Sequence, residues 1–356
     1  MRGARRLSSA AVVRKILALL LVLGPVTILA KHLGAGDMTL FALAAAALVP
    51  LAWLIGESTE HAAHHTGPGI GGFINATFGN APELIIALLA IHEGLFDVVR
   101  GSLAGSVIGN LMLVLGFSLL FGGRGYLDRA SSLVSLALVG LATVLFLIPA
   151  IPGFDGDPER RFIAQLGVPI SIALLVIYSI VTVIALRRHQ QMHVSDDPGE
   201  MTGWSLSKSL LMLGAATVVT ALVAEVLVSS LQVFAEKAGL SEFFVAAVIV
   251  AIVGNAAEHG GAVVVAAKGN IKLASEIALA SSAQVAVFLI PAVALISWAL
   301  KPLALSFRPV EMAALAGAVV FTGAVLWDGR SSRLRGAILI AAYVAVAILF
   351  FAVGDR

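Results

Sequence analysis

Long apolar runs separated by short polar segments make up most of this chain of 356 residues. About 20 apolar residues cross the hydrocarbon core of a bilayer as a helix, and at that length the pattern predicts eleven spans. The predicted spans cover residues 14–31, 39–56, 70–91, 95–121, 131–151, 164–186, 205–232, 241–267, 272–299, 309–327 and 334–354. We therefore expect an all-α polytopic membrane protein.

Composition supports this prediction. Hydrophobic residues make up 59% of the chain, charged residues only 12%, and mean hydropathy is +1.00. A solvated surface needs roughly a quarter of charged residues, and the longest polar linker, residues 187–204, is too short for a soluble domain. With no cysteine, the chain has no disulfide and no thiolate metal site. A net charge of +2 gives no indication of nucleic-acid binding.

Lysine and arginine predict the orientation, because they favour the cytoplasmic side of a membrane protein. If the N-terminus is cytoplasmic, the inner segments hold 15 of the 23 basic residues. The outer segments then hold Lys31, Arg100, Arg160, Arg161, Lys237, Lys301, Arg308 and Arg356. We expect a cell (inner) membrane protein with its N-terminus inside and, after eleven spans, its C-terminus outside.

The first span follows a basic head, "MRGARR", and could be read as a cleaved signal peptide. No small-x-small cleavage site follows its apolar stretch, which ends at Lys31 and His32. An uncleaved first span fits better.

Two spans carry an asparagine and a glutamate in their middle. In "FINATFGNAPELIIALLAI" (73–91) these are Asn80 and Glu83, and in "VAAVIVAIVGNAAEHGGAVVVAA" (245–267) they are Asn255 and Glu258. An acidic side chain at the centre of a span costs about 3 kcal/mol on insertion scales. The two motifs, "GNAPE" and "GNAAE", lie 175 residues apart, which indicates an internal repeat.

A second polar helix follows each motif: "LAGSVIGNLMLV" (103–114) and "ALASSAQVAVFL" (278–289). Five spans per half give the two halves opposite orientations, and such inverted repeats are typical of secondary transporters with a midplane site. We expect an N-terminal span outside the repeats (1–36), a first five-helix repeat (37–186), a cytoplasmic linker (187–204) and a second five-helix repeat (205–356).

The polar residues of these helices suit a hard cation. In each motif the asparagine and the glutamate, three positions apart, share one helix face, and a preceding glycine can free backbone carbonyls. Carboxylate, amide and carbonyl oxygens are the ligands that Ca²⁺ prefers. The candidate metal-ligating residues are Glu83, Glu258, Asn80, Asn255, Ser106, Asn110, Ser281 and Gln284. The alternative is that they only hold helices together by hydrogen bonds, for which amides would suffice without two matched glutamates.

Two further groups remain open. His259, next to Glu258, either relays protons together with Glu83 and Glu258 or hydrogen-bonds a neighbouring helix. The segment "ESTEHAAHHTGPG" (57–69) spaces acids and histidines as a helix would. It reads as a solvated cytoplasmic amphipathic segment rather than a metal site, with Glu57 and Glu60 as a candidate cytoplasmic entrance for cations.

The motifs resemble those of the calcium/proton exchangers, a family of the cation/calcium antiporter superfamily. The resemblance is carried by "GGFINATFGNAPELIIALLA", "GSVIGNLMLVLGFSLLFGG" and "VAIVGNAAEHGGAVVVAAKGNIKLASEIALASSAQVAVFLIP", and it extends from about residue 50 to the C-terminus. It implies an exchanger whose glutamates at the positions of Glu83 and Glu258 bind Ca²⁺ and exchange it for protons. Ala280, where the family often has glycine, and Pro82, where it varies, are modest departures.

The expected function is secondary antiport of cytoplasmic Ca²⁺ for external protons by alternating access, serving cation homeostasis. Two buried carboxylates can be neutralised by protons or by Ca²⁺, so the two compete for the same oxygens. The expected partners are Ca²⁺, protons and the bilayer, with no cofactor. Both a monomer and a homo-oligomer are compatible with the sequence.

A sodium/calcium exchanger, or an exchanger of another monovalent cation, is the alternative within the superfamily. Its motifs supply more hydroxyls and acids than this chain has at Asn80, Asn255 and Gln284. A cation channel would need rings of charge around a pore. A membrane hydrolase would need a nucleophile–base pair or a metal-activated water, and neither an enzyme nor a channel matches the repeat.

Overall fold

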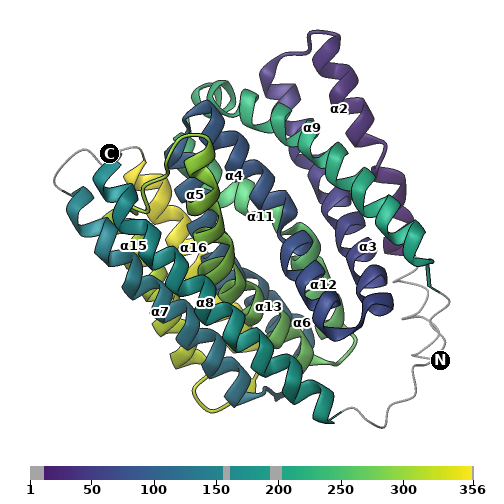
Figure 1. Cartoon of the computed structure of the whole chain (residues 1–356), viewed down its shortest axis with the longest axis vertical. Coiled ribbons are helices and arrows are strands. Elements are labelled where there is room, and N and C mark those ends of the chain that lie inside the picture. Colours follow the sequence, from purple (N-terminus) through teal and green to yellow (C-terminus); the bar gives the residue numbers. More distant parts are fainter. Residues whose placement is uncertain (1–11, 155–160, 193–202, 355–356) are drawn as a thin grey trace.

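The structure, a computed structural model, describes residues 12–154, 161–192 and 203–354. These residues are almost entirely helical (Figure 1). The first half contains helical residues 12–20, α2 (Leu23–His32), α3 (Asp37–Gly79), α4 (Ala81–Glu93), α5 (Phe96–Ile108), the π-helix η1 (Gly109–Val114), α6 (Leu115–Gly122), α7 (Arg129–Phe154) and α8 (Arg161–Met192).

The second half contains α9 (Leu206–Ala238), α10 (Glu242–Phe244), the π-helix η2 (Val245–Val250), α11 (Ala251–Gly254), α12 (Ala256–Ala267), α13 (Ile271–Gln284), the π-helix η3 (Val285–Leu289), α14 (Ile290–Ile296), the short 3₁₀ helix η4 (Ser297–Ala299), α15 (Pro309–Val325) and α16 (Arg333–Val353). The all-α polytopic prediction is confirmed.

Eight helices among the described residues are long and apolar enough to cross a membrane, or nine if the bent pair Glu242–Gly254 and Glu258–Ala267 counts as one span. The two other predicted spans correspond to shorter helices. α4 has 13 residues, and α15 has 17. The predicted span 70–91 covers the end of α3, the break at Asn80 and α4, so apolar residues on both sides of a helix break were counted as one span.

The segment 57–69, expected to be solvated, is part of the continuous helix α3. Ser58 and Thr59 are fully buried, and their hydroxyls donate to the carbonyls of Leu54 and Ile55. Within residues 57–66 only part of the surface is exposed, because one face of the helix packs inward. The central linker is shorter than expected, since α8 continues to Met192 and α9 begins at Leu206. The remaining linker residues 193–202 lie outside the described residues.

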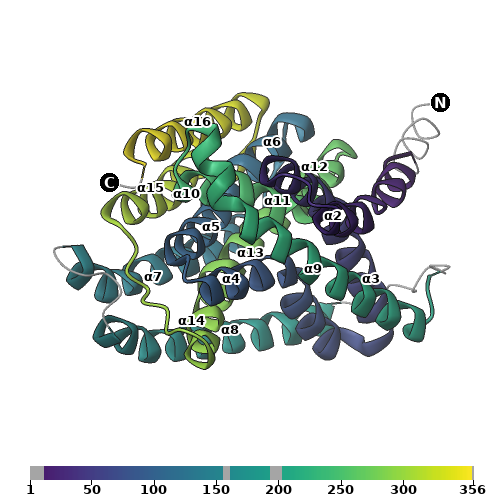
Figure 2. The same ribbon diagram turned by 90° about the horizontal axis from the view of Figure 1, so that it is seen from above.

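The helices form two groups with the site-bearing helices between them. Figure 1 shows α2, α3 and α9 together on the right, while α5 to α8 and α13 to α16 form the larger body on the left. α4, α11 and α12 lie between these groups. The view from above shows α4 and α9 running side by side (Figure 2), in agreement with the direct packing of these two helices. One large apolar cluster, which includes Phe41, Leu111 and Phe243, runs through both groups.

A two-stranded ribbon connects the two halves at one end of the larger body. β1 (Gly125–Tyr126) pairs antiparallel with β2 (Arg330–Ser331), with Tyr126 opposite Arg330. The loop after α6 and the loop before α16 are therefore fastened to each other, although they are about 200 residues apart in the sequence.

Candidate cation site

The two acidic motifs occupy equivalent breaks in the helices. Asn80 separates α3 from α4 with φ −99° and ψ 16°, and Asn255 separates α11 from α12 with φ −87° and ψ 8°. At the second break the helix direction changes by 58°. Neither asparagine has helical φ and ψ, so each motif begins a new helix in the interior of the protein. Broken helices of this kind are tolerated at membrane depth only where protein or a cavity surrounds them.

Each glutamate is the third residue of the helix that follows its break. Glu83 lies in the first turn of α4 and Glu258 in the first turn of α12. Unpaired backbone N–H groups give a helix N-terminus partial positive charge, so both helices favour carboxylates at these positions. The local chain thus places two carboxyl groups at helix N-termini, where lipid alone would exclude them.

The two carboxylates lie close together. Glu83 is buried, with 8% of its surface exposed, and it packs on the break of the second motif: a Cβ placed on Gly254 would lie 3.3 Å from Glu83 Cγ. The Glu258 carboxylate is near enough to repel that of Glu83 electrostatically. The structure therefore brings the predicted acids of the two repeats together.

Four of the predicted amide and hydroxyl residues join the two halves in one hydrogen-bonded network. The Asn255 Nδ2 group donates to Ser106 Oγ at 2.7 Å. The Asn110 Nδ2 group donates to Ser281 Oγ at 3.0 Å, and it lies 3.5 Å from Asn255 Oδ1. Ser281 Oγ in turn donates to Glu258 Oε2. All of these bonds except the last connect a residue of the first half with one of the second.

The remaining predicted residues lie around this network. Asn80 is buried at the break before α4. Gln284 is the last residue of α13, three positions after Ser281, and is half-buried. His259 follows Glu258, and its Nε2 atom is buried with no hydrogen-bond partner among the described residues. Asn110 lies in the π-helix η1, and such π segments are frequent at functional sites.

The predicted entrance residues lie elsewhere, on the middle of α3. The Glu57 carboxylate pairs with Arg14 at 2.9 Å and lies 3.7 Å from His61 Nε2. Glu60 is exposed. Among the described residues no group of three or more histidines and acids could hold a metal ion by itself, so the segment does not form a separate metal site there.

The donor set fits a hard cation. Glu83 Oε2 and Asn110 Oδ1 are buried acceptor oxygens with no hydrogen-bond partner among the described residues. Buried acceptors are normally satisfied, and a cation satisfies them. A cavity of about 10 Å³ adjoins Glu83, lined also by Ser102, Ser106 and Ala251. That volume is near the minimum that holds one water-sized particle.

Sequence reasoning missed a second polar cluster. Arg100 and Arg308 were assigned to outer loops, but Arg100 lies in α5 and is buried, with only 3% of its surface exposed. The buried carboxylate of Glu311, on α15, belongs to the same cluster. Arg100 lies five residues inside the predicted span 95–121. An unpaired charge is not stable there, so its position in the sequence already indicated a partner of opposite charge.

Comparison with known proteins shows the family of this chain. A family model described as "Sodium/calcium exchanger protein" matches the chain twice, at residues 37–187 and 208–352. The "Ca(2+)/H(+) antiporter" of Synechocystis sp. is 36% identical over 95% of this chain and 97% of its own. The "Ca(2+)/H(+) antiporter ChaA" of Bacillus subtilis is 36% identical over 92% of this chain and 96% of its own.

Solved structures agree as well. The structure of native YfkE is 35% identical and superimposes with a TM-score of 0.80 over 94% of this chain and 99% of its own. The fold and the site thus define a cation exchanger of the sodium/calcium exchanger superfamily. Within it, the chain belongs to the Ca²⁺/H⁺ antiporter family.

Proposed function

We propose that this chain exports cytoplasmic Ca²⁺ in exchange for external protons, by alternating access to one site between its two repeats. Antiport of Ca²⁺ and H⁺ is the activity of its family, and the chain is a secondary transporter rather than an enzyme. The observation that carries the site assignment is the convergence of Glu83 and Glu258, with a network of amide and hydroxyl groups joining the repeats around them.

In the proposed site, Glu83 and Glu258 provide the charge that binds Ca²⁺. Asn80, Asn255, Ser106, Asn110, Ser281 and Gln284 supply neutral oxygens or orient the carboxylates. Ca²⁺ takes six to eight oxygens at about 2.3–2.6 Å, which a set of this size can provide. The two alternative ways to neutralise a pair of buried carboxylates are one Ca²⁺ or protons, and this competition couples the two flows.

Coupling requires that the protein reorients only when its carboxylates are neutralised. Moving two uncompensated charges past a dry barrier is costly, whereas the Ca²⁺-loaded and protonated forms avoid that cost. An inward proton gradient then drives Ca²⁺ outward. His259, adjacent to Glu258, is proposed to assist proton transfer, and Glu57 and Glu60 to attract cations at the cytoplasmic side.

The proposed arrangement is a multi-pass protein of the cell membrane with its N-terminus in the cytoplasm and its C-terminus outside. It divides into an N-terminal span, two inverted five-helix repeats (37–186 and 205–356) and the linker between them. The two matches of the family model support a two-repeat organisation, and inverted repeats place a shared site near the midplane.

Reconstitution into liposomes tests the proposal. Ca²⁺ flux is followed under an imposed pH gradient and, separately, under an imposed Na⁺ gradient. The proposal predicts flux with the pH gradient alone. Flux that requires Na⁺ would replace it with sodium/calcium exchange, and flux without countermovement of either ion would indicate a channel.

A further inference from the structure

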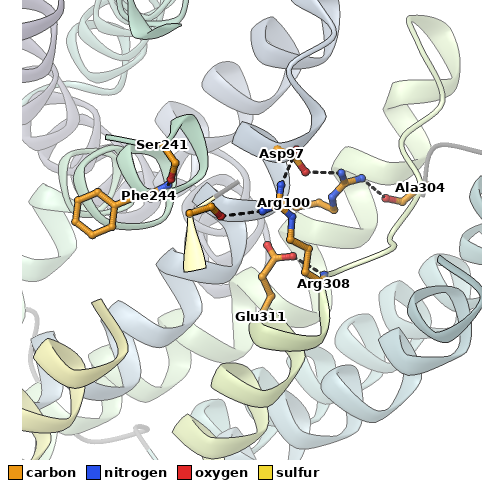
Figure 3. Close-up of polar contacts among 8 residues, drawn as sticks. Asp97, Arg100, Ser241, Phe244, Ala304, Arg308 and Glu311 are labelled. Atoms are coloured by element: carbon orange, nitrogen blue, oxygen red, sulfur yellow. Dashed lines mark hydrogen bonds and ion pairs between the residues drawn. The ribbon is translucent and has the colours of Figure 1, made fainter. Parts of the chain in front are cut away.

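A charged cluster lies at the start of α5, remote from the acidic motifs (Figure 3). Asp97 accepts from the Arg100 guanidinium at 2.7 Å through Oδ1 and from the Arg308 guanidinium at 2.7 Å through Oδ2. The Glu311 carboxylate accepts from the backbone N–H of Arg308 at 2.6 Å. Two arginines and two carboxylates cancel in formal charge. The Asp97–Arg308 pair thereby fastens the start of α5, in the first half, to the start of α15, in the second.

A second ion pair is related to this one by the internal repeat. The 175-residue offset that relates Asn80 to Asn255 and Glu83 to Glu258 also relates Asp97 to Lys272. Lys272, at the start of α13, pairs with Asp128 at 3.2 Å. Asp128 immediately precedes α7, as Arg308 immediately precedes α15. The second ion pair therefore also joins the two halves, with the order of charges reversed.

The two ion pairs lie at opposite ends of the larger body. Arg308 donates to the carbonyl of Gly354, which directly follows α16. Asp128 lies two residues after Tyr126, which pairs with Arg330, three residues before the start of α16. One ion pair therefore lies near each end of α16, a membrane-spanning helix of 21 residues. At about 1.5 Å per residue that helix is about 30 Å long, the thickness of the hydrocarbon core.

The two ion pairs are separated from the serines of the site by the same number of residues. Ser106 lies nine residues after Asp97 on α5, and Ser281 lies nine residues after Lys272 on α13. Nine residues of helix measure about 14 Å, and a helix transmits a displacement along its axis with little loss. A shift at either clamped end therefore shifts the serine that hydrogen-bonds within the site.

We propose that Asp97–Arg308 and Lys272–Asp128 are mirrored clamps, one at each membrane face, that set the axial positions of α5 and α13. Their residues are positioning residues: they touch no transported ion, and they act by holding Ser106 and Ser281 in register with Glu83 and Glu258. This inference rests on the proposed function, because it assumes that the serines belong to the cation site.

The two clamps differ in environment, and this sets the expected order of effects. The side chains of Arg308 and Asp97 are 19% and 44% exposed, and the buried Arg100 also donates to Asp97, whereas the side chains of Lys272 and Asp128 are 58% and 36% exposed. Exposed ion pairs are weak because water and salt screen them. Asp128 is additionally held by the backbone N–H of Ser131. Opening the Asp97 clamp is therefore expected to have the larger effect.

The experiment measures initial rates of pH-driven Ca²⁺ uptake into proteoliposomes as a function of Ca²⁺ concentration. Asp97→Asn is expected to raise the Ca²⁺ KM about tenfold and Lys272→Gln about threefold, with the maximal rate nearly unchanged, as for loss of uniform binding. Glu225→Gln is the matched control, because it breaks the Lys31–Glu225 pair at 2.8 Å, which lies on α2 and α9 and holds no site residue.

Exchanging the two charges of a clamp distinguishes a positioning role of the ion pair from a simple loss of protein stability. The double variant Lys272→Asp with Asp128→Lys copies the charge order of the other clamp, so it is expected to restore the KM that Lys272→Gln raises. An unchanged KM in Asp97→Asn and Lys272→Gln would overturn the proposal. So would a lowered maximal rate with an unchanged KM, or a failure of the exchanged pair to restore the KM.

Ser106→Ala and Ser281→Ala are measured in the same assay. If neither changes the KM, the proposed site fails, and the clamps fail with it. If the serine variants raise the KM while the clamp variants do not, only the clamp proposal fails.

Discussion

The side chain of Glu83 lies directly against Gly254, so that a Cβ on Gly254 would stand 3.3 Å from Glu83 Cγ and 3.6 Å from Oε1. The acid of the first motif thus packs on the glycine of the second. A Cβ at this distance would make an unusually tight contact, so the Glu83 side chain would have to give by a few tenths of an ångström. The contact also explains how one carboxylate from each repeat reaches the same place.

Gly254→Ala is therefore expected to weaken Ca²⁺ binding. The added methyl group requires the Glu83 side chain to give by a few tenths of an ångström, and we expect this misplacement to raise the Ca²⁺ KM about threefold. Gly260→Ala, on the following helix α12, is the control, since a Cβ there meets no atom within 4 Å among the described residues. Equal KM values for the two variants in pH-driven uptake would contradict this contact.

Ser281 and Ser282 provide a second matched pair. Ser281 Oγ donates to Glu258, whereas Ser282 Oγ donates to the carbonyl of Ala278 at 3.0 Å within its own helix. A hydrogen bond to a charged group contributes about 1.5–3 kcal/mol, so Ser281→Ala is expected to raise the Ca²⁺ KM about tenfold. Ser282→Ala should leave it within about twofold. A larger effect at Ser282 would indicate that helix packing, not the site, explains these serines.

Asn255 tests the connection between the repeats. Its amide donates to Ser106 at 2.7 Å and to the carbonyl of Ala251 at 2.9 Å. Asn255→Ala removes both bonds and leaves buried partners unsatisfied, at a cost of about 1–3 kcal/mol each. We expect loss of most transport together with a lower unfolding temperature. Full transport at normal stability would show that the network is dispensable.

The loop before α16 carries a pH-dependent ion pair. The Arg335 side chain and the backbone N–H of Arg330 hold the pKa of Asp328 well below its usual range. A carboxyl whose pKa is lowered in the folded state stabilises the protein above its unfolded pKa of about 3.9. That contribution is lost as the pH falls toward the lower, folded pKa.

Asp328→Asn is accordingly expected to lower the unfolding temperature of the detergent-solubilised protein by a similar amount from about pH 7 to pH 5. Below about pH 4 the difference from the unmodified protein should shrink. If the difference in unfolding temperature stays constant down to about pH 3, the Asp328 side chain stabilises the loop through uncharged contacts rather than through its charge.

The sequence indicated which polar residues lie together in the interior better than it indicated how they are connected. Asn80, Glu83, Asn255 and Glu258 were identifiable because buried polar residues repeat with one spacing in otherwise apolar spans. Ser106, Asn110 and Ser281 were also found on the correct helices. That Asn110 donates to Ser281, across 171 residues, depends on how the halves dock, and local patterns do not contain that information.

Arg100 was misplaced for a physical reason. Arg100 and Arg308 were both assigned to outer segments, where arginines are usually solvated; Arg308 does lie in the loop before α15, but Arg100 lies inside α5. Here Asp97 and Glu311 compensate them within the protein. The continuous helix α3 was not predicted because residues 57–69 were interpreted as a solvated amphipathic segment after the second span, whereas Ser58 and Thr59 are buried and satisfy their hydroxyls within the helix.

The most direct test of the account is pH-driven Ca²⁺ uptake into inverted membrane vesicles by Glu83→Gln and Glu258→Gln. Glu93→Gln, at the exposed end of α4, is the control. We expect each site variant to abolish uptake while the control transports normally. Uptake retained in either site variant would contradict a mechanism in which Ca²⁺ and protons compete for this pair of carboxylates.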